Sequence, residues 1–120
     1  MELVTLEQIR KTYTQGKVSV TAIDRVDLTV SAGEFLALAG PSGSGKTTLL
    51  NIIGGLDMPD SGRVTVAGND FSTMNAGSLA RLRLRSIGFV FQFYNLIPVL
   101  SAEENVEYIM LLQGVPAKER

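Results

Sequence analysis

The first 34 residues carry the hydrophobic pattern of β structure. Residues 18–23 and 26–30 alternate apolar and polar side chains, which is typical of half-exposed antiparallel strands. Residues 3–13 predict a further strand with Leu6 and Ile9 in the core, followed by a turn at 15–17. We therefore expect residues 1–34 to form a mostly antiparallel β layer that ends in a turn at 31–34.

Two short apolar runs interrupt this alternation, at residues 35–39 and 87–91. An unbroken run of this length is typical of a strand buried on both faces, so we expect both to be central strands of a parallel sheet. Residues 63–67 predict another strand, with turn residues on either side.

Helices are predicted in three places. Residues 49–53 continue a helix that begins at about Gly45 and is closed by two glycines at 54–55. Residues 78–85 form a second helix, with Leu79 and Leu82 expected to face inward and Leu84 a further candidate. Ser101 and Glu104 form a capping box that opens a third helix, which ends before Gly114. The expected fold class is therefore α/β, with the antiparallel β layer beside a core of parallel strands and helices.

Composition narrows the possible functions. The chain has 120 residues, enough for one domain at most, and 11 basic against 12 acidic residues give a net charge of −1. We therefore expect no overall attraction to nucleic acid or to an anionic membrane surface. No cysteine or histidine is present, which excludes disulfides, thiolate metal sites and a histidine base. An acidic start and the lack of a long apolar run predict a cytoplasmic chain.

The chemistry of the chain is concentrated in a glycine-rich stretch between the run at 35–39 and the first helix. It consists of Gly40, Pro41, Ser42, Gly43, Ser44, Gly45, Lys46, Thr47 and Thr48. This is the pattern Gly, four residues, Gly-Lys-Ser/Thr, whose backbone N–H groups cradle a nucleotide's phosphates at a helix N-terminus. Such a loop between a strand and a helix predicts a P-loop NTPase core. A flexible Gly/Ser loop with a chance lysine is the competing interpretation.

Three residues of this stretch have individual expected roles. Lys46 supplies a mobile positive charge for the β- and γ-phosphates, the Thr47 hydroxyl ligates Mg²⁺, and Thr48 contacts the α-phosphate. A nucleotide and Mg²⁺ are therefore the expected ligands of the loop.

Taken in order, the motifs of the chain resemble the N-terminal half of the ATP-binding subunit of an ABC transporter. Apart from the loop, the resemblance rests on Lys11-Thr12-Tyr13, Val26-Asp27-Leu28, Gly33-Glu34-Phe35, Gly55-Leu56-Asp57, Pro59, Ser61-Gly62, residues 87–92 and Glu104-Asn105-Val106. Residues 54–57, 79–83 and 95–98 are most similar to the subfamily of lipoprotein-releasing and macrolide- or peptide-exporting systems. The resemblance implies a RecA-like core, with residues 1–34 as the β layer and 35–120 as the P-loop core and the start of a helical region.

The resemblance also implies roles for residues outside the loop. Tyr13 matches the aromatic residue that stacks on adenine; a strand-end tyrosine packed on the core is the alternative. Gln92 matches the glutamine that reaches the Mg²⁺ or the attacking water, and it joins Lys46 as a catalytic candidate; an ordinary polar strand end is the alternative. Residues 93–100 and the helix after them resemble the surface on which a permease docks, although the apolar residues 108–112 also suit an internal core helix.

The family implies two partners and a location. These are a transmembrane permease, which selects the substrate, and a second copy of the subunit in a head-to-tail dimer around two ATP molecules, at the inner face of the membrane. The Leu-Ser-Gly-Gly-Gln signature is absent, and no strand ends in Asp-Glu. A complete domain of this kind is about double this length, so we expect the parent protein to be an export ATPase and this chain alone to bind nucleotide with almost no turnover.

Three other functions fit parts of the sequence. A GTPase or small-molecule kinase could use the same loop, but no Asn-Lys-x-Asp run for guanine is present. The chain could also be a non-hydrolysing module that occupies a permease. Non-transport members of the family, in DNA repair or on ribosomes, share the loop; the lack of a strong basic face argues against nucleic acid as a partner.

Overall fold

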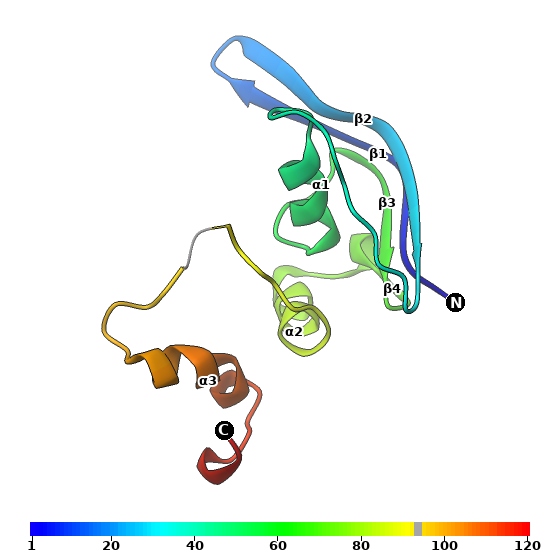
Figure 1. Cartoon of the computed structure of the whole chain (residues 1–120). Coiled ribbons are helices and arrows are strands. Elements are labelled where there is room, and N and C mark those ends of the chain that lie inside the picture. The colour runs from blue at the N-terminus through cyan, green and yellow to red at the C-terminus, as the bar shows by residue number, and fades with distance from the viewer. Residues whose placement is uncertain (93–94) are drawn as a thin grey trace. The chain divides into compact units, whose positions relative to one another are not determined.

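The computed structural model describes residues 1–92 and 95–120 (Figure 1). It contains two compact units, Met1–Leu79 and Ala80–Arg120, which are described in turn.

The first unit is built on a four-stranded sheet. Its strands are β1 (Glu2–Gln15), β2 (Val18–Ser31), β3 (Ser61–Val66) and β4 (Asn69–Asp70), in the order β2-β1-β3-β4 with every pair antiparallel. The antiparallel β layer predicted for residues 1–34 is therefore confirmed, with a tight turn at 16–17 between β1 and β2. The strand predicted at residues 63–67 is present as β3, and it pairs with β1 in the same sheet. The short strand β4 was not predicted from the sequence.

The second strand is longer than its sequence pattern suggested. The two alternating runs at 18–23 and 26–30 belong to the single strand β2, whose pairing with β1 is irregular between Ile9 and Lys11. Arg25, between the runs, has a φ of 50°, and this local left-handed turn accounts for the break in alternation.

The core of the first unit lies between the sheet and α1 (Lys46–Ile53). Leu49 and Ile52 are buried on α1, which packs on β2 and β3 (Figure 1). The predicted core residues Leu6 and Ile9 are both buried, as is Leu79 at the end of the unit. Phe71, in the short 3₁₀ helix η1 (Phe71–Thr73), is 1% exposed. Burial of these side chains is the main favourable term holding α1 on the sheet.

The second unit is helical. It takes in the end of α2 (Ala76–Ser86), then α3 (Ala102–Leu112) and the 3₁₀ helix η2 (Ala117–Glu119). The predicted capping box is present: the Ser101 hydroxyl accepts from the Glu104 N–H, and the Glu104 carboxylate accepts from the Ser101 N–H. The amide of Gln113 donates to the carbonyl of Leu84 at 2.6 Å, which joins the end of α3 to α2. No side chain described in this unit is fully buried.

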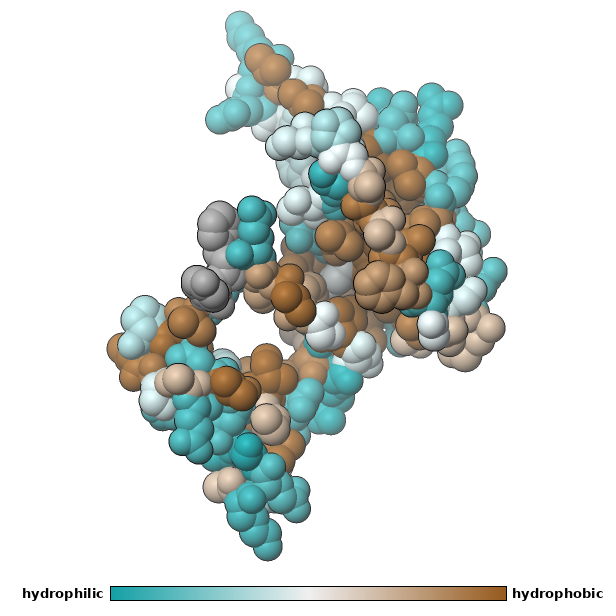
Figure 2. All heavy atoms as spheres, in the orientation of Figure 1, coloured by the Kyte–Doolittle hydropathy of each residue, from teal (hydrophilic) through white to brown (hydrophobic). Residues whose placement is uncertain are grey.

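Two predicted strands do not form in this chain. Residues 35–39 and 87–91 are not strands, and Phe35 and Val90 are 98% and 101% exposed. Figure 2 shows exposed apolar side chains in the part of the first unit where residues 34–39 run. A buried parallel strand needs a hydrogen-bonded neighbour, and no described strand pairs with either run. The two runs are as apolar as buried strands, but among the described residues neither has a strand to pair with.

The packing of α1 predicts how substitutions on its two faces differ. Ile52→Val removes one methylene from a side chain that is 0% exposed, and should lower the free energy of unfolding by about 0.5–1.5 kcal/mol. Leu50→Ala is the matched control, because Leu50 is 56% exposed on the same helix and alanine favours helices. Urea denaturation followed by circular dichroism measures both. A larger loss for Leu50→Ala would contradict this assignment of the buried face.

Candidate functional site

The glycine-rich loop leads directly into α1 and leaves the start of the helix open. Gly45 is the N-cap residue, in the left-handed conformation with φ 94° and ψ 6°. No side chain caps the helix, and its first turn contains no acidic residue. The N–H groups of that turn and the positive end of the helix dipole are therefore available to an anion.

Gly45 also meets the sheet at this point. A Cβ atom at Gly45 would lie 2.6 Å from the carbonyl oxygen of Ala22 on β2, and 3.4 Å from Cγ1 of Ile23. Any residue other than glycine would push the loop away from β2, besides straining its own backbone. The requirement for glycine at this position therefore comes from both the turn and the neighbouring strand.

Lys46 folds back over the loop that precedes it. Its ammonium group donates to the carbonyl of Gly40, and it lies 3.5 Å from the carbonyl oxygen of Pro41. The charge is thus held beside the open start of α1 by two backbone carbonyls. Backbone donors and a cation at one place form a site suited to a phosphate group.

The hydroxyl groups that follow Lys46 are the available metal ligands in the loop. Thr47 is exposed on the first turn of α1, and Thr48 is half-buried. In the described part of the chain, no three acidic side chains converge on a possible metal position. A magnesium ion here would therefore take most of its ligands from phosphate oxygens and water, with the Thr47 hydroxyl as the loop's contribution; this suits Mg²⁺, which keeps several waters.

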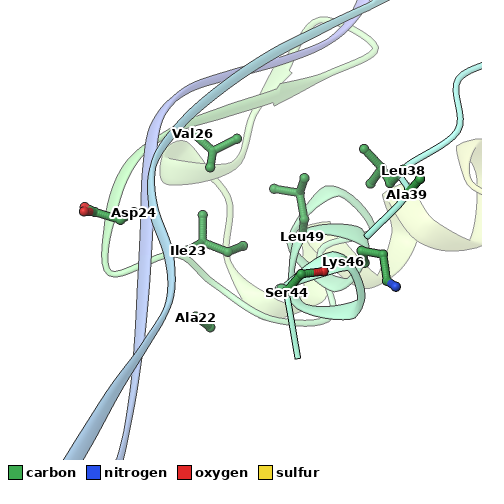
Figure 3. Close-up of a pocket in the computed structure, with 10 residues that line it drawn as sticks. Ala22, Ile23, Asp24, Val26, Leu38, Ala39, Ser44, Lys46 and Leu49 are labelled. Atoms are coloured by element: carbon green, nitrogen blue, oxygen red, sulfur yellow. The ribbon is translucent and has the colours of Figure 1, made fainter. Parts of the chain in front are cut away.

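A cavity of about 300 Å³ lies behind the loop, between β2, α1 and residues 38–39 (Figure 3). Ile23 and Val26 of β2 and Leu49 of α1 point into it, whereas Asp24 points away from it (Figure 3). The Lys46 ammonium is also directed away from these apolar groups. Most of the lining is apolar, so the loop and the helix start suit a phosphate better than this cavity does.

The strand register brings Tyr13 close to the loop. Ala22, which Gly45 touches, lies between Thr21 and Ile23, and these two pair with Thr12 and Lys11 of β1. The next pair along is Tyr13 with Val20. At about 3.3 Å per residue, that pair is about 7 Å along the strand from Ala22. The register therefore places Tyr13 in the part of the hairpin that adjoins the contact between Gly45 and β2.

Tyr13 belongs to a polar cluster that joins β1 to the turn after α1. Its hydroxyl donates to Oδ2 of Asp57 at 2.6 Å, and the Lys11 ammonium lies 5.3 Å from the centre of its ring. The same ammonium is 3.3 Å from Oδ1 of Asp57 and 3.7 Å from Oδ1 of Asp60. The hydrogen bond from Tyr13, and also Lys11, hold the pKa of Asp57 below its usual value, although burial opposes this. Asp57 is therefore a carboxylate at neutral pH.

Gln92 lies in the second unit and is exposed. Its approach to a magnesium ion or to the attacking water stays a prediction. Of the stretch 93–100 predicted to meet a permease, residues 93 and 94 lie outside the described residues. The rest of that stretch and α3 border a groove, which is described below.

Sequence reasoning assigned no role in the site to Asp57, Lys11 or the Ala22 carbonyl. The Tyr13 and Asp57 positions are 44 residues apart, and the Gly45 and Ala22 positions are 23 apart. Local pattern carries no signal for contacts of that span. The only sequence signal for these residues is that Lys11 and Asp57 lie within motifs that carry the family resemblance.

Comparison with known proteins gives three consistent findings. The family model described as "ABC transporter" matches residues 23–120. The macrolide export ATP-binding/permease protein MacB of Brucella abortus (strain 2308) is 52% identical over 118 residues, which is 98% of this chain and 18% of MacB. The lipoprotein-releasing system ATP-binding protein LolD of Anaeromyxobacter dehalogenans (strain 2CP-C) is 55% identical over 108 residues, which is 90% of this chain and 45% of LolD.

Solved structures agree with these relatives. The dimeric structure of MJ0796, titled a bacterial ABC transporter cassette, superposes with a TM-score of 0.88 at 43% identity and covers 92% of this chain and 47% of that one. A second MJ0796 structure, in a post-hydrolysis state bound to ADP and Pi, has the same TM-score at 44% identity. The chain therefore spans about half of this cassette or of LolD. The predicted fold class is confirmed by these likenesses, and no described helix has the length and apolar character needed to cross a membrane.

The contact between Gly45 and β2 predicts unequal effects at two glycines. Gly16→Ala should cost about 1–2 kcal/mol of unfolding free energy, because Gly16 has a φ of 63° but open space around it. Gly45→Ala should cost more, since the added methyl group would also collide with the Ala22 carbonyl. Urea denaturation of the two variants measures the difference. Equal losses would show that the loop does not depend on its contact with β2.

Proposed function

Because the chain belongs to the ABC transporter family, we propose that it binds Mg-ATP through residues 40–48 and that its parent protein is an export ATPase. The observation that carries this proposal is the uncapped start of α1 with Lys46 held beside it. An open helix start and a nearby cation favour the charge of a triphosphate.

In this proposal each loop residue has a definite task. The N–H groups from Gly43 to Thr48 would surround the phosphates, and the Thr47 hydroxyl would ligate the magnesium ion. The Lys46 ammonium, which donates to the Gly40 carbonyl in this structure, would instead bind the β- and γ-phosphate oxygens. Tyr13 stacks on the adenine ring. Gln92 is the proposed contact to the magnesium ion or to the attacking water. The bound Mg²⁺ would neutralise charge that develops on the phosphates.

Hydrolysis requires more than this binding site. Phosphoryl transfer depends on positioning and on charge stabilisation, including a group that orients the attacking water. The chain contains no histidine and no Leu-Ser-Gly-Gly-Gln segment. We therefore expect this chain by itself to bind nucleotide with little turnover, and the parent protein to complete the site in a head-to-tail dimer. The dimeric MJ0796 cassette supports dimerisation of the parent protein, and the MJ0796 structure with ADP and Pi supports its hydrolysis of nucleotide.

The parent protein would act at the inner face of the membrane through a permease. MacB carries the words ATP-binding and permease in one name, and LolD belongs to a lipoprotein-releasing system. Our candidate for the docking surface is a groove of about 450 Å³ in the second unit, between α3 and the segment before it. Its lining includes Leu96, Ile97, Val106 and Ile109, and Leu96 and Val106 are 63% and 76% exposed. Figure 2 shows apolar side chains over this part of the chain.

The loop assignment predicts the effect of removing its lysine. Lys46→Ala should weaken Mg-ATP binding by about tenfold or more, since a hydrogen bond to a charged group contributes about 1.5–3 kcal/mol. Lys17→Ala is the control, because Lys17 is an exposed lysine in the turn between β1 and β2. Isothermal titration calorimetry measures both. Unchanged affinity in Lys46→Ala would contradict the proposed site.

The groove assignment predicts a separation of two functions. Leu96→Asp places a charge in the apolar groove and should abolish capture of the chain by the cytoplasmic face of its permease, because the charge would lose its hydration there. Mg-ATP affinity should stay unchanged. A pull-down beside a calorimetric titration checks both properties. Full capture of Leu96→Asp would rule out this docking surface.

A further inference from the structure

The Tyr13 side chain is held at both its edge and its face. Its hydroxyl donates to Asp57 at 2.6 Å, and the Lys11 ammonium lies 5.3 Å from the centre of the ring. The residue is nevertheless 44% exposed, so the ring keeps open surface beside these contacts. An exposed tyrosine at a strand end would otherwise sample several rotamers.

The turn that carries Asp57 is itself anchored. The N–H groups of Leu56 and Asp57 donate to the carbonyl of Asn51 at 2.9 and 3.2 Å, which ties the turn to the end of α1. Asp60 adds a second tie, because its carboxylate accepts from the Thr12 N–H at 2.7 Å and its N–H donates to the Arg10 carbonyl at 2.8 Å. The acceptor for the Tyr13 hydroxyl therefore sits on a part of the chain fixed to both α1 and β1.

The same helix has the phosphate loop at its other end. Residues 40–48 open α1, whereas the Asp57 turn closes it. Through Asp57, the orientation of the Tyr13 ring is thus set by the helix whose N-terminus receives the phosphates. Fixing a base-contacting ring before binding reduces the conformational entropy lost on binding.

We infer that Asp57 is a positioning residue for nucleotide binding: it holds the Tyr13 ring in the orientation that receives the base. This inference rests on the proposed function, in which Tyr13 stacks on adenine. Asp57 does not touch the nucleotide itself, and it acts through the phenol hydroxyl. Lys11 has a secondary part, since it bridges Asp57 and the face of the ring.

The test compares two probes on the intact chain, Mg-ATP and magnesium tripolyphosphate, by isothermal titration calorimetry. Tripolyphosphate reports on the loop alone, so the ratio of the two affinities isolates the contribution of the base and sugar. Tyr13→Phe keeps the ring and removes the hydroxyl, and Asp57→Ala removes the acceptor. Each should lower the affinity ratio by about 2- to 10-fold, the range expected for one hydrogen bond, with tripolyphosphate affinity unchanged.

Three further variants sharpen the result. The Tyr13→Phe/Asp57→Ala double variant should be no worse than either single one, because both remove the same interaction. Asp57→Asn keeps an oxygen acceptor and should hold the ratio near that of the wild type. Thr14→Val removes a hydroxyl from the neighbouring residue, which bonds only to Ser19 among the described residues, and should leave the ratio unchanged.

Several outcomes would overturn the inference. One is a Tyr13→Phe variant that keeps the wild-type ratio of Mg-ATP to tripolyphosphate affinity. Another is a double variant whose loss equals the sum of the two single losses. A third is an Asp57→Asn variant whose ratio is as low as that of Asp57→Ala. Equal loss of both probes in Asp57→Ala would show a general structural role. A wild-type chain that binds both probes equally well contradicts this inference and the stacking role of Tyr13, but leaves phosphate binding by the loop intact. A chain that binds neither probe contradicts the proposed nucleotide site itself.

Discussion

The contact of the glycine-rich loop with β2 is the constraint on which the rest of the site depends. Gly45 takes a left-handed conformation and lies so near the Ala22 carbonyl that a side chain would not fit between them. That contact fixes where α1 begins. The start of α1 in turn places its unpaired N–H groups and Lys46 together, while the buried Leu49 and Ile52 hold the helix on the sheet. The hydrophobic core and the binding loop are thus parts of one arrangement.

The sheet contributes to the site through its register. Because β1 pairs with β2 next to the point where the loop touches, Tyr13 comes near the loop although they are about 30 positions apart in the chain. The turn after α1 then holds Tyr13 through Asp57. In the proposed site both ends of α1 therefore take part: the start would receive the phosphates, and the turn after its end would orient the aromatic residue expected to meet the base.

The two exposed apolar runs show how far a hydrophobic pattern depends on its context. Residues 35–39 and 87–91 have the composition of buried parallel strands, yet neither forms one here. A parallel strand is stabilised by neighbours that are distant in sequence. The chain spans about half of LolD and of the MJ0796 cassette, so we propose that the pairing strands belong to the remainder of the parent protein. The apolar groove beside α3 differs from these runs, because the partner proposed to cover it is a separate protein, the permease.

The sequence by itself determined the features that rest on local chemistry: the glycine loop and the helix it opens, the capping box at Ser101, the hairpin of β1 and β2, and the family. Each depends on residues within a few positions of one another or on an ordered set of motifs. Only the tertiary structure decided that β3 joins the N-terminal sheet, that Gly45 meets the Ala22 carbonyl and that Asp57 holds Tyr13. These contacts join segments 23 to about 60 residues apart, and the energy that selects them comes from strand pairing and core packing, which a local pattern does not encode.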